Sequence, residues 1–297
     1  MNAPAVQASI DIVARMREIA VDGSRSDKLL AAEILADPDF ATRAAISRLA
    51  ERAGVSQPTV TRFCRSLGCA GLHDFKVRLA QAVATTGRYI KPATETQNGA
   101  GHVAQLIATG AHGAIESVQA GLDDAALARA ADLVTGARMV RAYGSGGSSS
   151  LAAVELENRL FRLGLHVASH IDAEMQRMTA AVADADAVIV AYSVSGELRS
   201  IIEAVTTARL YGAKVIAITA PGSTLAAAAN VTLPFLVDEI MNVFRPSPAR
   251  YAMLALTDML AMSVAERIGA PAIERMRRIK HQQNYAKGDA ARLPLGD

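Results

Sequence analysis

Residues 46–67 read ISRLAERAGVSQPTVTRFCRSL, and this stretch predicts two short helices joined by a tight turn. Gly54 stands where a helix would end in a left-handed residue, a conformation that glycine adopts without a steric clash. Ser56 is placed to cap the second helix, and Pro58 falls in its first turn, where the missing N–H does no harm. Apolar residues recur at helical spacing in both segments, at Ile46, Leu49, Ala50 and Ala53 and then at Val60, Phe63 and Leu67. The pattern is that of a helix-turn-helix, with residues 57–67 as the recognition helix.

The second helix of this motif leaves polar and basic side chains on its outer face. We expect DNA contacts from Ser56, Gln57, Thr59, Thr61, Arg62 and Arg65. Residues 40–91 contain nine Lys or Arg against two Asp or Glu, whereas residues 92–239 contain nine against 15. A basic segment beside an acidic one indicates that a polyanion binds the first and avoids the second. The alternative is an ordinary helical hairpin in a protein core, but this explains neither the charge nor the outward polar residues.

The chain has 297 residues, enough for two domains with separate cores. No apolar run approaches the roughly 20 residues that span a bilayer, and the N-terminus does not resemble a signal peptide, so we expect a cytoplasmic protein without a membrane partner. Cys64 and Cys69 are expected to be reduced, with a redox switch as the less favoured alternative. The six histidines are scattered along the sequence and form no set of three metal ligands, so we predict no metal site and no cofactor.

The chain is predicted to be an α/β protein, in which an all-α helix-turn-helix domain precedes a doubly wound sheet of five parallel strands. Residues 1–25 are expected to fray around a short amphipathic segment, and a helix over residues 26–36 ends at Asp37 and Pro38. Gly, Pro, Thr and Asn accumulate over residues 85–101, which suggests a linker. The predicted domains are residues 1–88 and 102–285, joined by a linker at 89–101. The predicted strands are 139–143, 166–169, 187–192, 214–219 and 231–236. The other predicted helices are 72–84, 102–119, 123–135, 173–182 and 249–268, one after each Ser/Gly loop as far as residues 163 and 211, and a tail from residue 272 that is helical until 288.

Two loops rich in Ser and Gly follow the first and third predicted strands, GSGGSSS at 144–150 and SVSGE at 193–197. Ligands of open α/β sheets bind at the carboxyl ends of the strands, where each of these loops opens a helix. Helix N-termini present free N–H groups and serine hydroxyls add donors, which suits a phosphate. The first loop is not a dinucleotide fingerprint, because its third glycine position is Ser149, and it lacks the Gly-Lys of a Walker loop. The alternative is that both loops are tight turns and helix caps without a ligand.

On these motifs the chain resembles the RpiR family of bacterial transcriptional regulators, which join an N-terminal helix-turn-helix to a C-terminal sugar isomerase (SIS) domain. The resemblance rests on residues 46–76, the two Ser/Gly loops and the segment RPSPARY at 245–251, and it covers about residues 20–285. It implies that the SIS domain senses a phosphorylated sugar or sugar acid and thereby controls genes of carbohydrate metabolism. The effector site that it implies consists of Ser145, Gly146, Ser148, Ser193, Ser195, Gly196 and Glu197. Leu198 stands where family members usually have Thr or Ser, which leaves a less conventional sugar acid or an unphosphorylated molecule as alternative effectors.

Two functions compete at this point. One is a regulator that binds double-stranded operator DNA and a small anionic effector derived from a sugar. The other is a sugar-phosphate isomerase with an accessory N-terminal domain, which needs a base near the sugar carbons. Glu155, Glu174 and Glu197 form no acid–base pair by their spacing, and an isomerase has no use for a basic recognition helix. We therefore predict a regulator that is not an enzyme and has no catalytic residues. Paired recognition helices read two half-sites, which predicts a homodimer or homotetramer.

Overall fold

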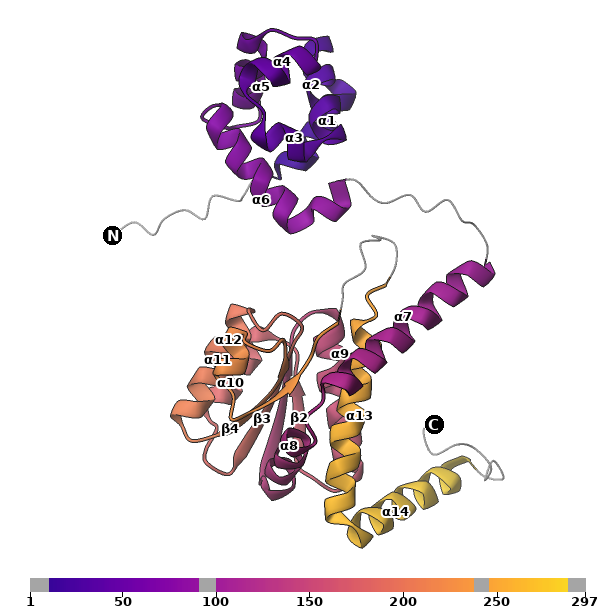
Figure 1. Cartoon of the computed structure of the whole chain (residues 1–297). Helices are drawn as coiled ribbons and strands as arrows, with labels where there is room; N and C mark the ends of the chain where they lie inside the picture. Colours follow the sequence, from indigo (N-terminus) through magenta and orange to yellow (C-terminus); the bar gives the residue numbers. More distant parts are fainter. Residues whose placement is uncertain (1–10, 91–99, 238–245, 288–297) are drawn as a thin grey trace. The chain divides into compact units, whose positions relative to one another are not determined.

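The structure is a computed structural model that describes residues 11–90, 100–237 and 246–287 (Figure 1). The chain divides into two compact units, and of the described residues, 11–90 belong to the first and 100–237 and 246–287 to the second. The described part of the first unit is helical, and the second contains a parallel sheet covered by helices. Each unit has its own apolar core. The predicted fold class is therefore confirmed.

The N-terminal unit is built from helices that share one core. Their bounds are α1 (Ile12–Asp22), α2 (Arg25–Ala36), α3 (Pro38–Arg43), α4 (Ile46–Arg52), α5 (Gln57–Ser66) and α6 (Leu72–Ile90). Phe63 and Phe75 are fully buried in this core, together with Met16 and Leu30. Helices α4 and α5 are the predicted helix-turn-helix. Gly54 between them has a φ of 66°, as the sequence led us to expect.

The prediction that residues 1–25 fray was wrong for the part that the structure describes. Asp11 caps α1 by accepting hydrogen bonds from the backbone N–H groups of Val13 and Ala14, at 3.0 and 3.1 Å. Ile12, Val13 and Met16 then pack into the core of the N-terminal unit. These residues are spaced one and three apart, so one side of a single short helix buries them. Residues 1–10 lie outside the described residues.

Two further differences come from helix capping and helix length. Asp37 ends α2, as predicted, but its side chain also caps α3 by accepting from the N–H of Phe40 at 3.2 Å. Pro38 is the first residue of α3, where its fixed φ suits a helix, and the sequence analysis did not predict this helix.

Helix α6 continues to Ile90 and α7 begins at Ala100, so helical residues occupy both ends of the expected linker. Residues 91–99 lie outside the described residues, and the domain bounds stay a prediction.

The C-terminal unit contains one sheet of five parallel strands among the described residues. The strands are β1 (Met139–Gly144), β2 (Val167–His170), β3 (Ala187–Ser193), β4 (Lys214–Thr219) and β5 (Val231–Pro234). Their spatial order is β2-β1-β3-β4-β5, so the direction of winding reverses between β1 and β3. Gly144 at the end of β1 lies opposite Tyr192 of β3. All five strands fall within a few residues of their predicted positions.

Helices cover both faces of this sheet, which makes it doubly wound (Figure 1). The helices of this unit are α7 (Ala100–Gly121), α8 (Asp124–Gly136), α9 (Gly147–Arg162), α10 (Ala173–Ala181), α11 (Arg199–Leu210), α12 (Thr224–Ala227), α13 (Ala249–Ile268) and α14 (Ala270–Lys287). Residues of α8, α9 and α13 form the core on one face, and residues of α10, α11 and α12 form the core on the other. Only the short α12 was absent from the sequence reading.

The left-handed turn at Gly54 allows a direct test of the helix-turn-helix. Gly54→Ala should lower the free energy of unfolding by about 1–2 kcal/mol, because a Cβ is disfavoured at positive φ. Gly71→Ala is the matched control, since Gly71 does not have a positive φ and an added Cβ would meet nothing within 4 Å. We expect that variant to be neutral or slightly stabilised. Urea unfolding followed by circular dichroism measures both, and equal effects would contradict the assignment of the turn.

Candidate functional site

The recognition helix α5 presents most of its predicted DNA-binding residues to solvent. Gln57, Arg62 and Arg65 are exposed, whereas Thr59 and Thr61 are half-buried. Ser56 is exposed but also has a structural role. Its hydroxyl accepts from the backbone N–H of Thr59 at 3.4 Å, and the two hydroxyl groups lie 2.8 Å apart. Val60, Phe63 and Cys64 occupy the inner side of the same helix, which holds the outer side toward the solvent.

Ion pairs separate the arginines of this unit into two groups. Arg52 lies between Glu33 and Asp37, and its guanidinium stacks over the ring of Phe40 at 4.3 Å. Three other arginines of the basic segment also have acidic partners on their own helices, namely Arg43, Arg48 and Arg78. Arg62 and Arg65 have no ion pair with any residue that the structure describes. Their charge is therefore available to phosphate groups of DNA.

The two cysteines lie inside the N-terminal unit rather than at its surface. Cys64 and Cys69 are both buried, and neither forms a disulfide. Burial raises the pKa of the Cys64 thiol to about 12, and it also raises the pKa of Cys69. Since the thiolate is the reactive form of cysteine, both side chains are poorly reactive at neutral pH. This disfavours the redox switch that the sequence left open.

The two Ser/Gly loops meet at the point where the strand order reverses. The first loop follows β1 and the second follows β3, and these strands are neighbours in the sheet. In open α/β sheets this reversal leaves a crevice at the carboxyl ends of the strands, because the flanking connections run to opposite sides. The structure thus brings together residues that are separated by about fifty positions in the sequence.

The first loop depends on two glycines. An added Cβ at Gly144 would lie 2.1 Å from the carbonyl oxygen of Ser149, so only glycine allows the start of α9 to approach β1. Gly146 is exposed, has a φ of 79° and precedes α9 without providing a side-chain cap. Ser145 and Ser148 are half-buried, whereas Ser149 is buried. The first N–H groups of α9 therefore lack a side-chain partner at the candidate site.

Gln176 of α10 supports this loop, and the sequence reading did not single it out. The side chain is fully buried, and its Nε2 donates to the carbonyl oxygens of Gly144 and His170 at 3.3 and 2.8 Å. It also donates to the hydroxyl of Ser145 at 3.2 Å. Because that hydroxyl accepts from Gln176, its own proton can point toward a ligand. The sequence signal that could have identified Gln176 is a polar residue on the inward face of a predicted helix.

The second loop is held by hydrogen bonds to its own residues and to α12. The backbone N–H of Gly196 donates to the hydroxyl of the buried Ser193 at 3.0 Å. Ser195 is exposed, and its hydroxyl accepts from the N–H of Glu197 at 3.3 Å. Gly196 has a φ of 71°, and an added Cβ would lie 2.0 Å from the hydroxyl oxygen of Ser223.

Glu197 is bound to α12 rather than directed at a ligand. Its carboxylate accepts from the backbone N–H and the hydroxyl of Thr224, at 2.9 and 2.7 Å. These two hydrogen bonds lower the pKa of Glu197. The carboxylate is therefore ionised at neutral pH, and it would repel an anion that came close. We accordingly give Glu197 a role in holding the second loop.

Helices α9 and α11 differ from α8, α10 and α12 at their first turns, whereas α13 also begins without a side-chain cap. Asp123, Asp172 and Ser223 cap α8, α10 and α12 with side-chain hydrogen bonds. No such bond caps α9 or α11, where Gly146 and Leu198 occupy the cap positions. Leu198 is 41% exposed, so the residue that departs from the family pattern leaves a first turn without a hydroxyl. Two uncapped N-termini provide N–H donors and partial positive charge for an anion.

Other kinds of site find no support in the part of the chain that the structure describes. No group of three His, Cys, Asp or Glu residues is placed to hold a metal ion there. Of the glutamates considered as bases, Glu155 pairs with Arg159 at 2.7 Å and Glu197 is bound to Thr224. Among the described residues, no helix is long and apolar enough to cross a membrane.

Comparison with known proteins decides the family. The helix-turn-helix domain of the rpiR family matches residues 10–86, and the SIS domain matches residues 134–263. The HTH-type transcriptional regulator HexR of Pseudomonas aeruginosa is 35% identical over 257 residues, which cover 86% of this chain and 90% of that protein. The chain belongs to the RpiR family of helix-turn-helix transcriptional regulators. The resemblance stated from the sequence motifs is thus confirmed.

Two further comparisons extend this result. The bifunctional protein glk of Paraburkholderia xenovorans is 34% identical over 280 residues, which are 93% of this chain but 41% of that protein. The structure of the Vibrio vulnificus NanR protein in complex with ManNAc-6P covers 94% of this chain and all of that one, with a TM-score of 0.59 and 22% identity. At that identity the likeness concerns the fold, which joins a helical unit to a SIS unit in this RpiR-family chain.

The unpaired arginines of α5 lead to a prediction about DNA binding. Arg62→Ala and Arg65→Ala should each weaken binding to operator DNA. Loss of a phosphate contact flattens the salt dependence by about one unit, whereas loss of a base contact relaxes specificity at one position by about 1–3 kcal/mol. Arg277→Ala removes one charge from α14 in the other unit and is the control. Fluorescence anisotropy at several salt concentrations separates these cases. Binding by both α5 variants that equals the control would refute the assignment of the recognition helix.

Proposed function

We propose that this chain regulates genes of carbohydrate metabolism by binding operator DNA through α5 and one anionic, sugar-derived effector through its SIS unit. The effector would lie between the first loop, residues 144–148, and the second loop, residues 193–197. The observation that carries this proposal is the pair of uncapped helix N-termini at the reversal of strand order. Ile201 in the first turn of α11 already donates to the carbonyl oxygen of Leu198, and an anion can accept from the other N–H groups of the two first turns that lack a protein acceptor.

The donors around this point suit the phosphate or carboxylate of a sugar derivative. The hydroxyl groups of Ser145 and Ser195 each accept a hydrogen bond from the protein, which leaves their protons free for the effector. Ser148 is half-buried in the first turn of α9 and adds a third hydroxyl. A phosphorylated sugar or sugar acid fits this set, and NanR was solved with a sugar phosphate. Because Leu198 contributes no hydroxyl, a carboxylate remains the second choice for the anionic group.

We propose binding without turnover. An isomerase needs a base close to the sugar carbons. Glu197, the acidic residue of the second loop, is bound to Thr224 and ionised. Binding then acts on DNA affinity, and this coupling is reciprocal: operator DNA changes effector affinity by the same factor. A protein that binds operator DNA must share a compartment with the chromosome, which supports the predicted cytoplasmic location.

The serine hydroxyl groups provide the test of the effector site. A thermal-shift screen of sugar phosphates and sugar acids identifies the ligand, because a ligand that binds only the folded protein raises its stability. Ser145→Ala and Ser195→Ala should each reduce affinity for that ligand by about 1.5–3 kcal/mol, the usual contribution of a hydrogen bond to a charged group. Both should leave DNA binding without effector nearly unchanged.

Ser150→Ala is the matched control for these variants. Its hydroxyl already donates to the carbonyl oxygen of Gly146 at 2.5 Å, so it has no free proton for the effector. Calorimetric titration should therefore give wild-type affinity for this variant. If the Ser145 and Ser195 variants also bind like wild type, the two loops are structural turns and the effector site lies elsewhere.

We also propose that the regulator is at least a homodimer. The apolar faces of the helices within residues 102–135 and 249–268 are largely used inside the unit, where α13 packs against α7, α8 and α9. A groove of about 300 Å³ instead lies between α9, α13 and α14, where apolar side chains are flanked by Arg159, Arg162 and Asp258. Met262 and Met276 line this groove and are 64% and 37% exposed. Exposed apolar side chains that cluster in this way are typical of subunit contacts.

This proposal predicts the effect of a charge in the groove. Met262→Glu should convert the oligomer to a monomer and weaken binding to an operator with two half-sites, because removing a carboxylate from water at a subunit contact is unfavourable even beside Arg159 and Arg162. Leu210→Glu is the control, since Leu210 is 81% exposed on α11, away from the groove. Light scattering at micromolar concentration measures the mass. A wild-type monomer, or an oligomer that Met262→Glu leaves intact, would contradict the proposed surface.

A further inference from the structure

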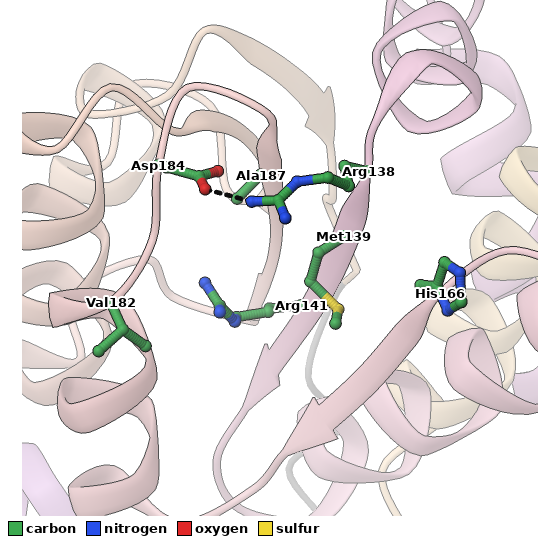
Figure 2. A pocket seen from close by; sticks show the side chains of 7 residues that line it. All are labelled: Arg138, Met139, Arg141, His166, Val182, Asp184 and Ala187. Atoms are coloured by element: carbon green, nitrogen blue, oxygen red, sulfur yellow. Dashed lines mark hydrogen bonds and ion pairs between the residues drawn. The ribbon is translucent and has the colours of Figure 1, made fainter.

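A second cavity lies at the amino-terminal end of the sheet strands, away from the two Ser/Gly loops. It measures about 340 Å³ and is lined by Arg138, Met139, Arg141, His166, Val182, Asp184 and Ala187 (Figure 2). Arg141 lies three residues before Gly144 in β1, and a strand rises by about 3.3 Å per residue, so the cavity and the first loop are separate places. Nothing in the proposed function uses this cavity.

Arg141 is unusual for its position in the sheet. Its neighbour in β3 is Ile189, which is fully buried in the core under α10 and α11. Tyr143, two residues further along β1 and therefore on the same face, is fully buried in that core as well. An arginine thus stands in a row of apolar and aromatic side chains.

The charge of Arg141 has no partner among the residues that the structure describes. Its Nη1 atom is buried and forms no hydrogen bond there. Arg138 is different, because it pairs with Asp184 and lies 3.8 Å from Asp186. Figure 2 shows both guanidinium groups on the side of Asp184 and Val182, and it shows His166 apart from them. The cavity is therefore lined by Arg138, which has carboxylate partners, and by Arg141, which has no ion pair with the described residues.

A buried guanidinium nitrogen without an acceptor is unfavourable for the folded state. An apolar side chain such as Met would fit the surroundings of Arg141 at lower cost. We propose that Arg141 holds the carboxylate or phosphate group of a small molecule that binds in this cavity. Because Nη1 is enclosed by protein, the anionic group would approach the edge formed by Nε and Nη2, whose two parallel N–H donors match a carboxylate or a phosphate.

The walls of the cavity limit the rest of the ligand. Met139, Val182 and Ala187 are apolar, so they favour a carbon skeleton over further charged groups. Asp184 and Asp186 stand close to Arg138 and disfavour a second anionic group at that end. The ligand that fits is a short organic acid or a phosphate monoester with one anionic group. It would be a second ligand of the SIS unit, in addition to the proposed effector.

The test uses the full chain and three probes, namely inorganic phosphate, glycerol 3-phosphate and pyruvate. Thermal unfolding is followed by circular dichroism with and without each probe, at constant ionic strength set by chloride, and calorimetric titration gives the affinities. We expect at least one probe to stabilise the wild type. Stabilisation by inorganic phosphate alone would identify a free-phosphate site, and stronger stabilisation by an organic probe would identify a site for the whole molecule.

Arg141→Met is the decisive variant. Without a probe, its unfolding temperature should equal or exceed that of the wild type, because the unpaired charge is gone. Its affinity for the probe should fall by about tenfold or more, as expected for a lost charge-assisted hydrogen bond. Arg141→Lys, which keeps the charge but not the planar pair of donors, should have an intermediate affinity. Arg177→Met removes an exposed arginine of α10 that does not line the cavity, and it should behave like wild type.

Three results would overturn the proposal. The first is the absence of any stabilisation of the wild type by the three probes at millimolar concentration. The second is an Arg141→Met variant that is less stable than wild type and binds the probe equally well, which would make Arg141 a structural residue. The third is a response that Arg141→Met keeps and that Ser145→Ala with Ser195→Ala removes, since the probe would then occupy the two Ser/Gly loops.

Discussion

The reversal of strand order between β1 and β3 is the constraint on which the C-terminal unit depends. Parallel strands require crossover helices, and the order β2-β1-β3-β4-β5 places α9 on one face of the sheet and α10, α11 and α12 on the other. The first turns of α9 and α11 therefore face the same crevice from the ends of neighbouring strands. Glycine at Gly144 and Gly196 is needed because any Cβ there would collide with the next element. The strand order thus accounts both for the close backbone packing at these glycines and for the N–H donors that lack a side-chain acceptor.

Electrostatic balance distinguishes arginines that hold the fold from those that are available to ligands. Arg52 and Arg138 each lie beside two carboxylates, and Arg52 also stacks on Phe40. Arg62, Arg65 and Arg141 lack an ion pair with the described residues. The first two are exposed on α5, where water solvates the charge at little cost. Arg141 has a buried nitrogen, so its charge needs a partner more strongly.

Much of this architecture could be predicted because its signals are local. The cap at Ser56, the left-handed Gly54 and the apolar spacing around Phe63 lie within one stretch of chain. The strands β3 and β4 are continuous apolar runs, which is typical of strands buried on both faces. Helix α1 was missed because only its packing distinguishes it from a frayed segment. Helix α3 was missed because Asp37 both ends one helix and caps the next.

The amino-acid sequence by itself determined the helix-turn-helix, the parallel sheet, the two Ser/Gly loops and the family, because each is encoded by spacing within a short segment. The tertiary structure alone decided which side chains are already engaged. In the folded protein the carboxylate of Glu197 accepts a hydrogen bond from Thr224, and Gln176 donates one to Ser145. Arg141 lies beside Ile189, and its Nη1 atom has no hydrogen-bond partner among the described residues. These relations join residues 27 to 48 positions apart, as in the pairs Glu197–Thr224 and Arg141–Ile189. Hydrogen bonds and burial depend on distances in space, and the separation of two residues along the chain does not determine these distances.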